Sequence, residues 1–324
     1  MAAPAARGTV CVTGAGGFLA SWLVKLLLSG DRYAVRGTVR DPSGSKNAHL
    51  MALEGAGERL RLAKADILDY SSVASAVAGC EGVFHVASPV PSGGPCPNPE
   101  VDILAPAVTG TLNVLRACYE AKVKRVVVVS SLAAVVCNPN WNKGKAFNED
   151  SWSDEEYCRK DQEYGWYFLS KTLAEREAFA YAAKTGLDVV TVCPALVIGP
   201  LMQSEMCTSV KVFLNFIKDE DAVENRFMHF VDVRDVADAL LLAYENPKAS
   251  GRYLCSSTLT SVSDIVNILK TLYPKYKYSK NLVEVENSAM CNTEKLEDLG
   301  WSFRPMEETL RDSVESYRAL GILN

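Results

Sequence analysis

Short runs of β-branched and other apolar residues alternate with longer amphipathic stretches up to about the middle of the chain. The apolar runs cover residues 9–13, 34–39, 59–65, 82–87, 125–131 and 188–194. Apolar residues recur at helical spacing over residues 18–29, 108–121 and 167–184. Alternating strand and helix signals are typical of a parallel sheet with helices on both faces. The sequence therefore predicts an α/β fold with a doubly wound parallel sheet.

Composition and charge narrow the class of protein. The 324 residues are 48% hydrophobic and 23% charged, the balance of a soluble globular protein. A net charge of -5 does not suit a nucleic-acid partner, which requires clustered lysines and arginines. The most apolar stretch, residues 126–137, is interrupted by two serines and is too short to span a membrane. We expect a small-molecule partner, with neither nucleic acid nor membrane.

The ten cysteines are scattered along the chain, and no C-x-x-C pair occurs. Structural metal sites use short ligand loops, and secreted disulfide scaffolds are small and rich in cysteine. The N-terminal segment enters its first apolar run almost at once, which leaves no room for a secretory signal. We therefore expect free thiols, no metal and a cytoplasmic location.

The clean alternation of strand and helix signals ends near Pro194. Ligands of doubly wound sheets bind at the carboxyl ends of the strands, where a second lobe can cover them. We predict a dinucleotide-binding domain over residues 1–193, to which residues 227–246 return. Residues 194–226 and 247–324 are predicted to form a smaller substrate-binding lobe.

Three glycines, Gly14, Gly16 and Gly17, follow the first apolar run and precede the first helical stretch. Glycines in such a turn let backbone N–H groups approach a dinucleotide's pyrophosphate, whose charge the helix N-terminus favours. The pattern is G-x-x-G-x-x-A, ending at Ala20, which is looser than the strict dinucleotide fingerprint. A purely structural turn is the alternative.

The second apolar run ends in TVRDP, where the adenosine ribose of a bound dinucleotide is expected. An arginine there suits a 2′-phosphate, because its planar guanidinium forms paired hydrogen bonds. Arg40 is the candidate, and Lys46 adds a second positive charge. The sequence favours NADP over NAD, with two solvated surface cations as the alternative.

Tyr167 and Lys171 are four residues apart on a predicted helix, so both side chains lie on one helical face. Two other Tyr-x-x-x-Lys matches overlap within residues 273–280, where Pro274 and a polar context do not support a helix. Ser131 ends the fifth apolar run, at the sheet edge where a reacting carbonyl is expected. Tyr167 is thus the candidate proton donor.

A free tyrosine has a pKa near 10, and lowering it to about 7 takes roughly 4 kcal/mol. We expect the charge of Lys171 to supply this effect and Ser131 to hydrogen-bond the substrate oxygen. The alternatives are that Tyr167 is a core aromatic residue and that Ser131 only satisfies backbone groups.

Other chemistries find less support in the sequence. There is no G-x-S-x-G elbow and no phosphate loop of the G-x-x-x-x-G-K-[ST] type. The three histidines are His49, His85 and His229. His85 lies within an apolar run and is interpreted as a satisfied core residue rather than a base.

Several motifs together resemble the extended short-chain dehydrogenase/reductases with their Rossmann sheet, and within them the plant cinnamoyl-CoA reductase and dihydroflavonol reductase family. The resemblance covers nearly the whole chain. It is carried by VTGAGGFLASWLV, VRDP, KADILD, GVFHVASP, WSDEEYC, WYFLSKTLAE, HFVDVRDVADALL and ENPKASGRYLCSS.

The resemblance implies a set of site residues. Catalysis would fall on Ser131, Tyr167 and Lys171. The remaining implied contacts are with NADP. They comprise Thr13, Gly14, Gly16, Gly17, Phe18 and Leu19 at the pyrophosphate, Arg40 and Lys46 at the 2′-phosphate, Asp66 and Ile67 at the adenine, Val86, Ala87 and Ser88 at the nicotinamide ribose, and Pro194, Ala195, Leu196, Val197 and Ser209 at the nicotinamide.

Two departures leave the substrate open. Cinnamoyl-CoA reductases typically read N-W-Y-C-Y-G-K where residues 165–171 read G-W-Y-F-L-S-K. Dihydroflavonol reductases typically carry an asparagine where Val136 stands. We expect an NADPH-dependent reductase that converts a hydroxycinnamoyl-CoA thioester to the aldehyde. The alternatives are reduction of hydroxycinnamaldehydes, other aldehydes or ketones, or dihydroflavonols, a sugar-nucleotide epimerase, and a non-catalytic NADP sensor.

The acyl part of such a substrate is flat and apolar and requires matching walls. Tyr164 and Trp166 precede the catalytic tyrosine, and Pro89 and Val90 follow the fourth apolar run. These four residues are candidates for the pocket, with core or lid packing as the alternative.

Overall fold

The centre of the protein is a seven-stranded sheet in the order β11-β6-β5-β4-β1-β2-β3. The computed structural model describes residues 8–88, 90, 96–141, 144–160, 165–217, 223–278, 282–284 and 289–323. Each neighbouring pair of strands in this sheet is parallel. The strands are β1 (Gly8–Val12), β2 (Tyr33–Val39), β3 (Leu60–Lys64), β4 (Gly82–His85), β5 (Arg125–Val129), β6 (Val189–Pro194) and β11 (Gly251–Cys255). The predicted doubly wound parallel sheet is confirmed.

The strand β11 corrects the predicted division of the chain. Residues 247–324 were expected in the smaller lobe, but β11 pairs with β6 along its whole length, from Gly251 opposite Val190 to Cys255 opposite Pro194. Four of its five residues are buried, which explains why this segment joins the sheet. The strand β11 comes after the segment 227–246 that was predicted to return to the dinucleotide-binding domain. The part of the chain that returns to this domain therefore extends beyond residue 246.

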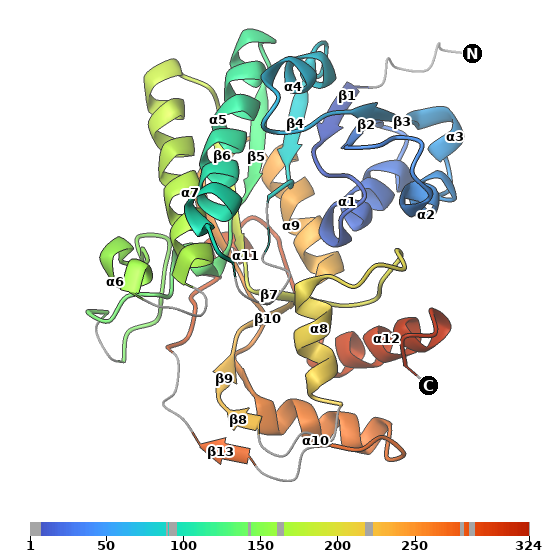
Figure 1. The fold of residues 1–324 in the computed structure, drawn as a ribbon, viewed down its shortest axis with the longest axis vertical. Helices are drawn as coiled ribbons and strands as arrows, with labels where there is room; N and C mark the ends of the chain where they lie inside the picture. Colours follow the sequence, from blue (N-terminus) through green and yellow to red (C-terminus); the bar gives the residue numbers. More distant parts are fainter. Residues whose placement is uncertain are drawn as a thin grey trace.

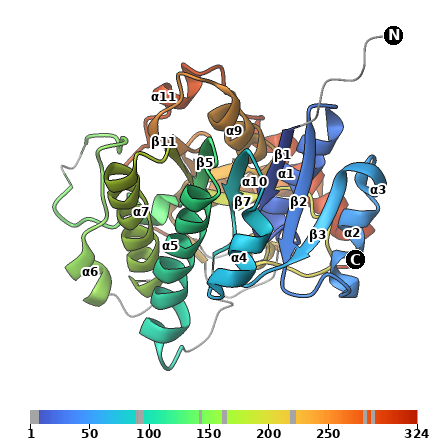
Figure 2. The ribbon, with the colours of Figure 1, turned by 90° about the horizontal axis from the view of Figure 1, so that it is seen from above.

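Helices cover both faces of the sheet. The helices α4 (Tyr70–Val77), α5 (Ala105–Glu120) and α7 (Gly165–Thr185) lie on one face, and α1 (Phe18–Ser29) and α9 (Val233–Glu245) lie on the other (Figure 2). Three of these helices coincide with the predicted amphipathic stretches, and α1 does so at both ends. The sheet is therefore shielded from solvent on both sides, as its apolar strands require.

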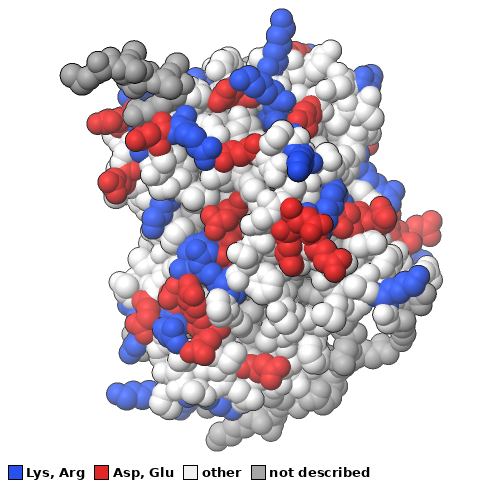
Figure 3. Space-filling model, turned by 180° about the vertical axis from the view of Figure 1, so that it is seen from behind, with Lys and Arg blue, Asp and Glu red and all other residues white. Residues whose placement is uncertain are grey.

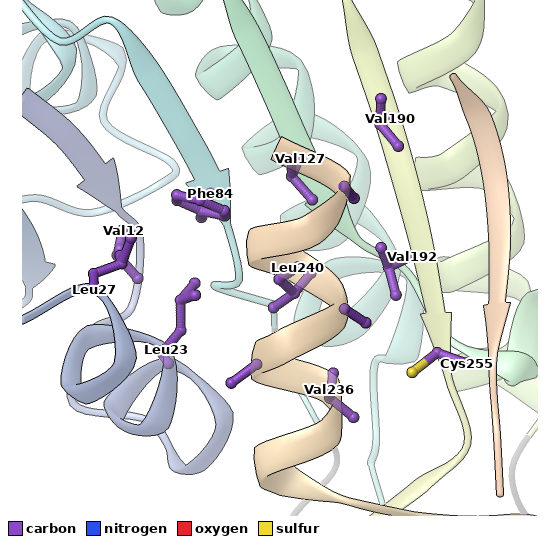
Figure 4. Close-up of a cluster of buried hydrophobic side chains, with 14 of the residues drawn as sticks. Val12, Leu23, Leu27, Phe84, Val127, Val190, Val192, Val236, Leu240 and Cys255 are labelled. Atoms are coloured by element: carbon purple, nitrogen blue, oxygen red, sulfur yellow. The ribbon is translucent and has the colours of Figure 1, made fainter. Parts of the chain in front are cut away.

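The core beneath α1 and α9 is built from aliphatic side chains. Leu240 and Val236 of α9 lie over Val127 of β5 and Val192 of β6 (Figure 4). Leu23 of α1 is fully buried in the same cluster. Burial of one such side chain stabilises the folded state by about 1.5–3 kcal/mol. This cluster therefore holds the sheet firmly beneath the loops at its carboxyl edge.

A smaller lobe lies beyond the carboxyl edge of the sheet, toward which the arrowheads of β4 and β5 point (Figure 1). Its fully buried side chains include Phe213, Phe230, Leu269 and Tyr317, which pack in a cluster of their own. The elements of this part are β7 (Leu196–Ile198), α8 (Thr208–Asn215), β8 (Val223–Asn225), β9 (Phe227–Met228), β10 (Phe230–Asp232), β12 (Thr260–Ser261), α10 (Val262–Leu272), β13 (Leu282–Glu284) and α12 (Met306–Ala319).

Short helical segments complete the described chain. They are η1 (Ser45–Asn47), α2 (Ala48–Met51), α3 (Ala56–Arg59), η2 (Glu100–Leu104), η3 (Leu132–Ala134), α6 (Glu155–Lys160) and α11 (Glu294–Glu297). Among the residues that the structure describes, no helix is both long and apolar enough to cross a membrane.

Side chains of lysine, arginine, aspartate and glutamate are each found on the surface of the protein. On the face shown in Figure 3, acidic and basic side chains are interspersed, and acidic atoms gather near the middle. All ten cysteines are free thiols. Within the described ranges, no group of three histidine, cysteine, aspartate or glutamate side chains could hold a metal ion.

Candidate active site

The carboxyl edge of the sheet brings the predicted site residues together along one line. The segments after β1, β2, β3, β4, β5 and β6 carry, in that order, Gly14, Arg40, Asp66, Ala87, Ser131 and Ala195. The strand order reverses between β1 and β4, which pair with each other at the centre of the sheet. Ligands of doubly wound sheets bind at such a reversal.

The glycine turn after β1 is required by its conformation. Gly14 has φ +66°, and an added Cβ would lie 3.1 Å from both the Cα and the Cβ of Ala87. Its N–H donates to Thr38 Oγ1 at 3.1 Å, and the N–H of Gly17 donates to the Gly14 carbonyl at 2.9 Å. At Gly16 a Cβ would lie 2.8 Å from Asn47 Oδ1. The turn is thus closely packed against the loops that follow β2 and β4.

The helix α1 begins directly after this turn. Gly17 is its N-cap, in extended conformation and without a side-chain cap, and Phe18 and Leu19 open the first turn. No acidic residue stands in that turn. The first N–H groups of a helix lack partners within the helix and carry its positive dipole end, so they favour an anion. The residues present therefore fit a pyrophosphate.

His85 is tied into a buried hydrogen-bond chain. Its Nδ1 lies 3.0 Å from Thr13 Oγ1, and its Nε2 lies 3.2 Å from Thr111 Oγ1. Thr13 Oγ1 also accepts the N–H groups of Val86 and Ala87, both at 3.0 Å. Burial lowers the pKa of His85 to about 3, so the ring is neutral. The interpretation of His85 as a satisfied core residue is confirmed.

The two predicted phosphate-binding cations lie at the end of β2. Arg40 and Lys46 are both exposed. The amide of Asn47 donates to the Asp41 carbonyl at 2.7 Å, which holds the Lys46 segment against the turn after Arg40. In the described part of the chain, no hydrogen bond or ion pair engages the Arg40 guanidinium. This side chain is available to an anionic ligand.

Asp66 and Ile67 follow β3, as predicted. The Asp66 carboxylate accepts the Leu68 N–H at 2.9 Å, and the Ile67 carbonyl accepts Asn113 Nδ2 at 2.9 Å. These bonds fix the backbone of the loop that follows β3. Ser88 lies after β4, next to Ala87, and is partly buried.

The predicted nicotinamide segment connects the sheet to the smaller lobe. Pro194 ends β6, the Ala195 N–H donates to the Cys255 carbonyl at 2.9 Å, and the Leu196 N–H donates to the His229 carbonyl at 3.1 Å. Val197 continues in β7. Ser209 stands in the first turn of α8, with its Oγ 3.3 Å from Cys207 Sγ.

Ser131 and Tyr167 meet directly. The Ser131 hydroxyl lies beside the phenol and favours the phenolate form of the tyrosine. Ser131 is the N-cap of η3, where its Oγ accepts the Ala133 N–H at 3.1 Å. Since that bond occupies a lone pair of the oxygen, the hydroxyl proton is free to point toward the phenol.

Lys171 lies beside the same tyrosine. Its Nζ is 6.0 Å from the centre of the Tyr167 ring and donates to the Val129 carbonyl at 3.5 Å. Burial lowers the pKa of Lys171 to about 8, although the negative charge of Glu175 opposes this lowering. At neutral pH the ammonium is therefore mostly charged.

The expected lowering of the tyrosine pKa is wrong for this arrangement. Burial raises the pKa of Tyr167, and only the Ser131 hydrogen bond opposes that rise. The physical reason is that the phenol is buried, and burial disfavours its charged form. Tyr167 is thus protonated at neutral pH, which is the form that a proton donor needs.

The sequence did not single out Glu175 and Arg252, whose buried side chains pair with each other near Lys171. Helical spacing contains a signal, because Glu175 comes four residues after Lys171 on α7. A small cavity adjoins Glu175 and Lys171. Its lining consists of His85, Ala87, Ser88, Thr111, Val128, Val129, Ser130, Lys171, Ala174 and Glu175.

The suggested walls of a substrate pocket are partly described. Trp166 is partly buried at the start of α7, and Val90 is 54% exposed. Pro89 and Tyr164 lie outside the described residues. Val136 is partly buried against the core and contributes no polar group.

The family of the chain follows from its sequence profile. The NAD dependent epimerase/dehydratase family matches residues 10–256. The chain belongs to that family. Within this epimerase/dehydratase family, cinnamoyl-CoA reductase 1 of Petunia hybrida is 44% identical over 319 residues, which cover 97% of this chain and 93% of that protein. The resemblance described from the motifs is confirmed.

Solved structures of reductases share the fold of this family member. Vestitone reductase from alfalfa (Medicago sativa L.) superposes with a TM-score of 0.84 at 32% identity, over 98% of this chain and 100% of that one. The yeast methylglyoxal/isovaleraldehyde reductase, solved as a complex with NADPH, has a TM-score of 0.83 at 28% identity, over 97% and 100% of the two chains.

Proposed function

We propose that the protein is an NADPH-dependent reductase that converts a hydroxycinnamoyl-CoA thioester to the hydroxycinnamaldehyde. The observation that carries the proposal is the 44% identity to the petunia cinnamoyl-CoA reductase over almost the whole of both chains. The adjacency of Ser131, Tyr167 and Lys171 at the end of β5 supports it, since this geometry suits proton transfer to a carbonyl oxygen.

The residues at the sheet edge fit NADP. Gly14 lets the turn after β1 pack closely against Ala87, and the N-terminus of α1, which has no side-chain cap, follows this turn. The free guanidinium of Arg40, with Lys46 beside it, would hold the 2′-phosphate. We assign the adenine to Asp66 and Ile67, the nicotinamide ribose to Val86, Ala87 and Ser88, and the nicotinamide to Pro194, Ala195, Leu196, Val197 and Ser209. When bound, the cofactor supplies hydride to the carbonyl carbon.

The chain's own residues orient and protonate the substrate oxygen. Ser131 donates its hydroxyl proton in a hydrogen bond to that oxygen, because its Oγ is already held by the Ala133 N–H. Tyr167, protonated at neutral pH, transfers its proton to the oxygen as negative charge develops there. Lys171 places a positive charge beside the tyrosine and stabilises the phenolate that results. The substrate is then a thiohemiacetal, whose C–S bond breaks as its hydroxyl proton returns to the Tyr167 phenolate. The aldehyde and the thiolate of coenzyme A are released.

The rest of the chain has a supporting role. We assign substrate binding to residues 194–226 and to the C-terminal part that follows β11. Trp166 and Val90 are assigned to the apolar walls, since the acyl group of the substrate is flat. Ten free cysteines support a reducing compartment, and we assign the protein to the cytoplasm.

A side-by-side assay tests this function. Purified protein is mixed with NADPH and, in turn, feruloyl-CoA, coniferaldehyde and a dihydroflavonol, and NADPH absorbance is followed. Selective oxidation with feruloyl-CoA supports the proposal. Turnover of only the aldehyde or the dihydroflavonol overturns the thioester assignment but retains a reductase.

The same assay addresses two other classes of protein. A sugar-nucleotide epimerase would retain NAD through purification, which extraction and absorbance would detect. A non-catalytic sensor would bind NADPH without oxidising it in the presence of any carbonyl compound. Either result would overturn the proposed reductase.

A further inference from the structure

The carboxylate of Glu175 is held in one position by five hydrogen bonds. The residue lies one helical turn after Lys171 on α7 and is 1% exposed. Its donors come from β6, from β11 and from the residue that follows β5. They are Ser130 Oγ at 2.8 Å, Thr191 Oγ1 at 2.6 Å, Cys193 Sγ at 3.3 Å, and Arg252 Nε and Nη2 at 3.0 and 2.8 Å.

Arg252 is fixed in turn, so the pair cannot rearrange easily. Its guanidinium also donates to the carbonyls of Ala134 and Ser151 and lies 3.8 Å from the centre of the Trp152 ring. A buried ion pair is costly to desolvate, and apolar residues of similar volume are often as stable. A structural role alone therefore leaves the presence of this carboxylate unexplained.

The groups around Lys171 include one fixed anion. His85 of β4 is neutral, because burial lowers its pKa to about 3. Cys193 of β6 is a neutral thiol, because burial raises its pKa. Tyr167 of α7 is also neutral, and the neighbouring groups of β5 and α5, Ser130 and Thr111, do not titrate. Glu175, which lines the same small cavity as Lys171, thus supplies the negative charge that favours the charged amine.

We propose that Glu175 is a positioning residue for Lys171: its carboxylate, fixed by Arg252, Ser130 and Thr191, keeps the buried ammonium charged and directed toward the Val129 carbonyl beside Tyr167. The inference rests on the proposed function, in which the charge of Lys171 supports proton transfer from Tyr167. Burial disfavours the charged amine, and the Glu175 charge opposes that effect.

The test removes the charge of Glu175 while keeping its shape. In Glu175→Gln, the titration of Lys171 is measured by competitive labelling with acetic anhydride from about pH 6 to about pH 11, with peptide mass spectrometry as the readout. We expect the pKa of Lys171 to fall by about one unit or more, as for loss of a nearby opposite charge. The high-pH limb of kcat with feruloyl-CoA should move in the same direction.

Two further variants separate charge from structure. Glu175→Asp keeps a carboxylate and should restore the pH profile toward that of the wild type. Glu155→Gln is the matched control, because it removes a carboxylate whose partner is the exposed Arg176 at 3.0 Å. Its Lys171 titration and its pH profile should match those of the wild type.

The outcomes decide the inference in each case. An unchanged Lys171 titration in folded Glu175→Gln overturns it. If that variant does not fold, the double variant Glu175→Gln/Arg252→Met avoids an unpaired buried charge, and an unchanged titration there overturns it equally. The labelling needs no substrate, so it remains decisive even if the wild type reduces none of the carbonyl compounds, a result that would overturn only the proposed function.

Discussion

The hydroxyl of Ser131, just after β5, lies beside the phenol of Tyr167 in the first turn of α7 and favours its phenolate form. The Ala133 N–H occupies an acceptor position on the same serine oxygen. The serine proton is consequently directed away from η3 and toward the tyrosine. A carbonyl oxygen placed between these hydroxyls would receive one hydrogen bond and one transferable proton.

Replacement of Tyr167 by phenylalanine removes that proton and little else. We expect kcat in Tyr167→Phe to fall by about a hundredfold to ten-thousandfold, the usual contribution of a general acid. NADPH binding, measured by fluorescence titration, should stay close to that of the wild type. Substantial turnover in this variant would rule out the proton transfer described above.

The glycine turn makes a prediction about stability and binding together. Gly14→Ala places a Cβ against Ala87 and forces φ +66° on an alanine. We expect the free energy of unfolding to fall by about 1–2 kcal/mol and NADPH affinity to fall with it. Urea denaturation and fluorescence titration provide the two measurements.

A glycine in open space serves as the control for that change. Gly57 lies in α3, and an added Cβ there meets no atom within 4 Å. Gly57→Ala should leave NADPH affinity unchanged and should not destabilise the protein. An equal loss of affinity in both variants would mean that the turn after β1 has no special role.

Most of the sheet could be predicted from the sequence because parallel strands buried on both faces are nearly continuous apolar runs. The strand β11 escaped that pattern, since it begins with a glycine and carries Arg252 at its second position. Arg252 can be buried in the sheet because it pairs with the buried carboxylate of Glu175, which lies 77 residues earlier in the chain. Helical periodicity alone does not reveal such a pairing.

The sequence was sufficient to predict which residues of the candidate site lie together, but it was not sufficient to predict the direction of their pKa shifts. Spacing on one helix and the end of one strand sufficed to place Tyr167, Lys171 and Ser131 near one another. The pKa of Tyr167 is raised because the phenol is buried. The extent of that burial is set by three-dimensional packing and has no counterpart in the spacing.

The assignment of the 2′-phosphate to Arg40 makes a prediction about which dinucleotide the protein prefers. Loss of charged hydrogen bonds to this phosphate should cost Arg40→Ser roughly ten- to a hundredfold in kcat/KM for NADPH. The kcat/KM for NADH should change little, because NADH lacks the phosphate. Arg61→Ser is the control, since Arg61 of β3 is exposed and donates to the Gly57 and Leu60 carbonyls.

The preference is measured as the ratio of the two kcat/KM values in each variant. A ratio that falls in Arg40→Ser but not in Arg61→Ser supports the assignment. Equal ratios in Arg40→Ser and the wild type would assign the phosphate to another cation, for which Lys46→Ala is the next variant to measure.

The buried imidazole of His85 makes the protein sensitive to acid. Its pKa in the folded protein is about 3, against 6.5 for a free histidine, because burial disfavours its charged form. The unfolded chain therefore takes up this proton first as the pH falls. The stability associated with neutral His85 is complete above about pH 6.5 and is lost as the pH falls from 6.5 toward 3.

Urea denaturation at a series of pH values measures this loss. The free energy of unfolding of the wild type should fall between pH 6.5 and pH 5, and the fall should be shallower in His85→Asn, which cannot take up the proton. His49→Asn is the matched control, because His49 is only partly buried and should retain most of the wild-type acid sensitivity. If His85→Asn and the wild type lose stability in parallel, the imidazole is already protonated in the folded protein, and the neutral chain from Thr13 through His85 to Thr111 must be abandoned.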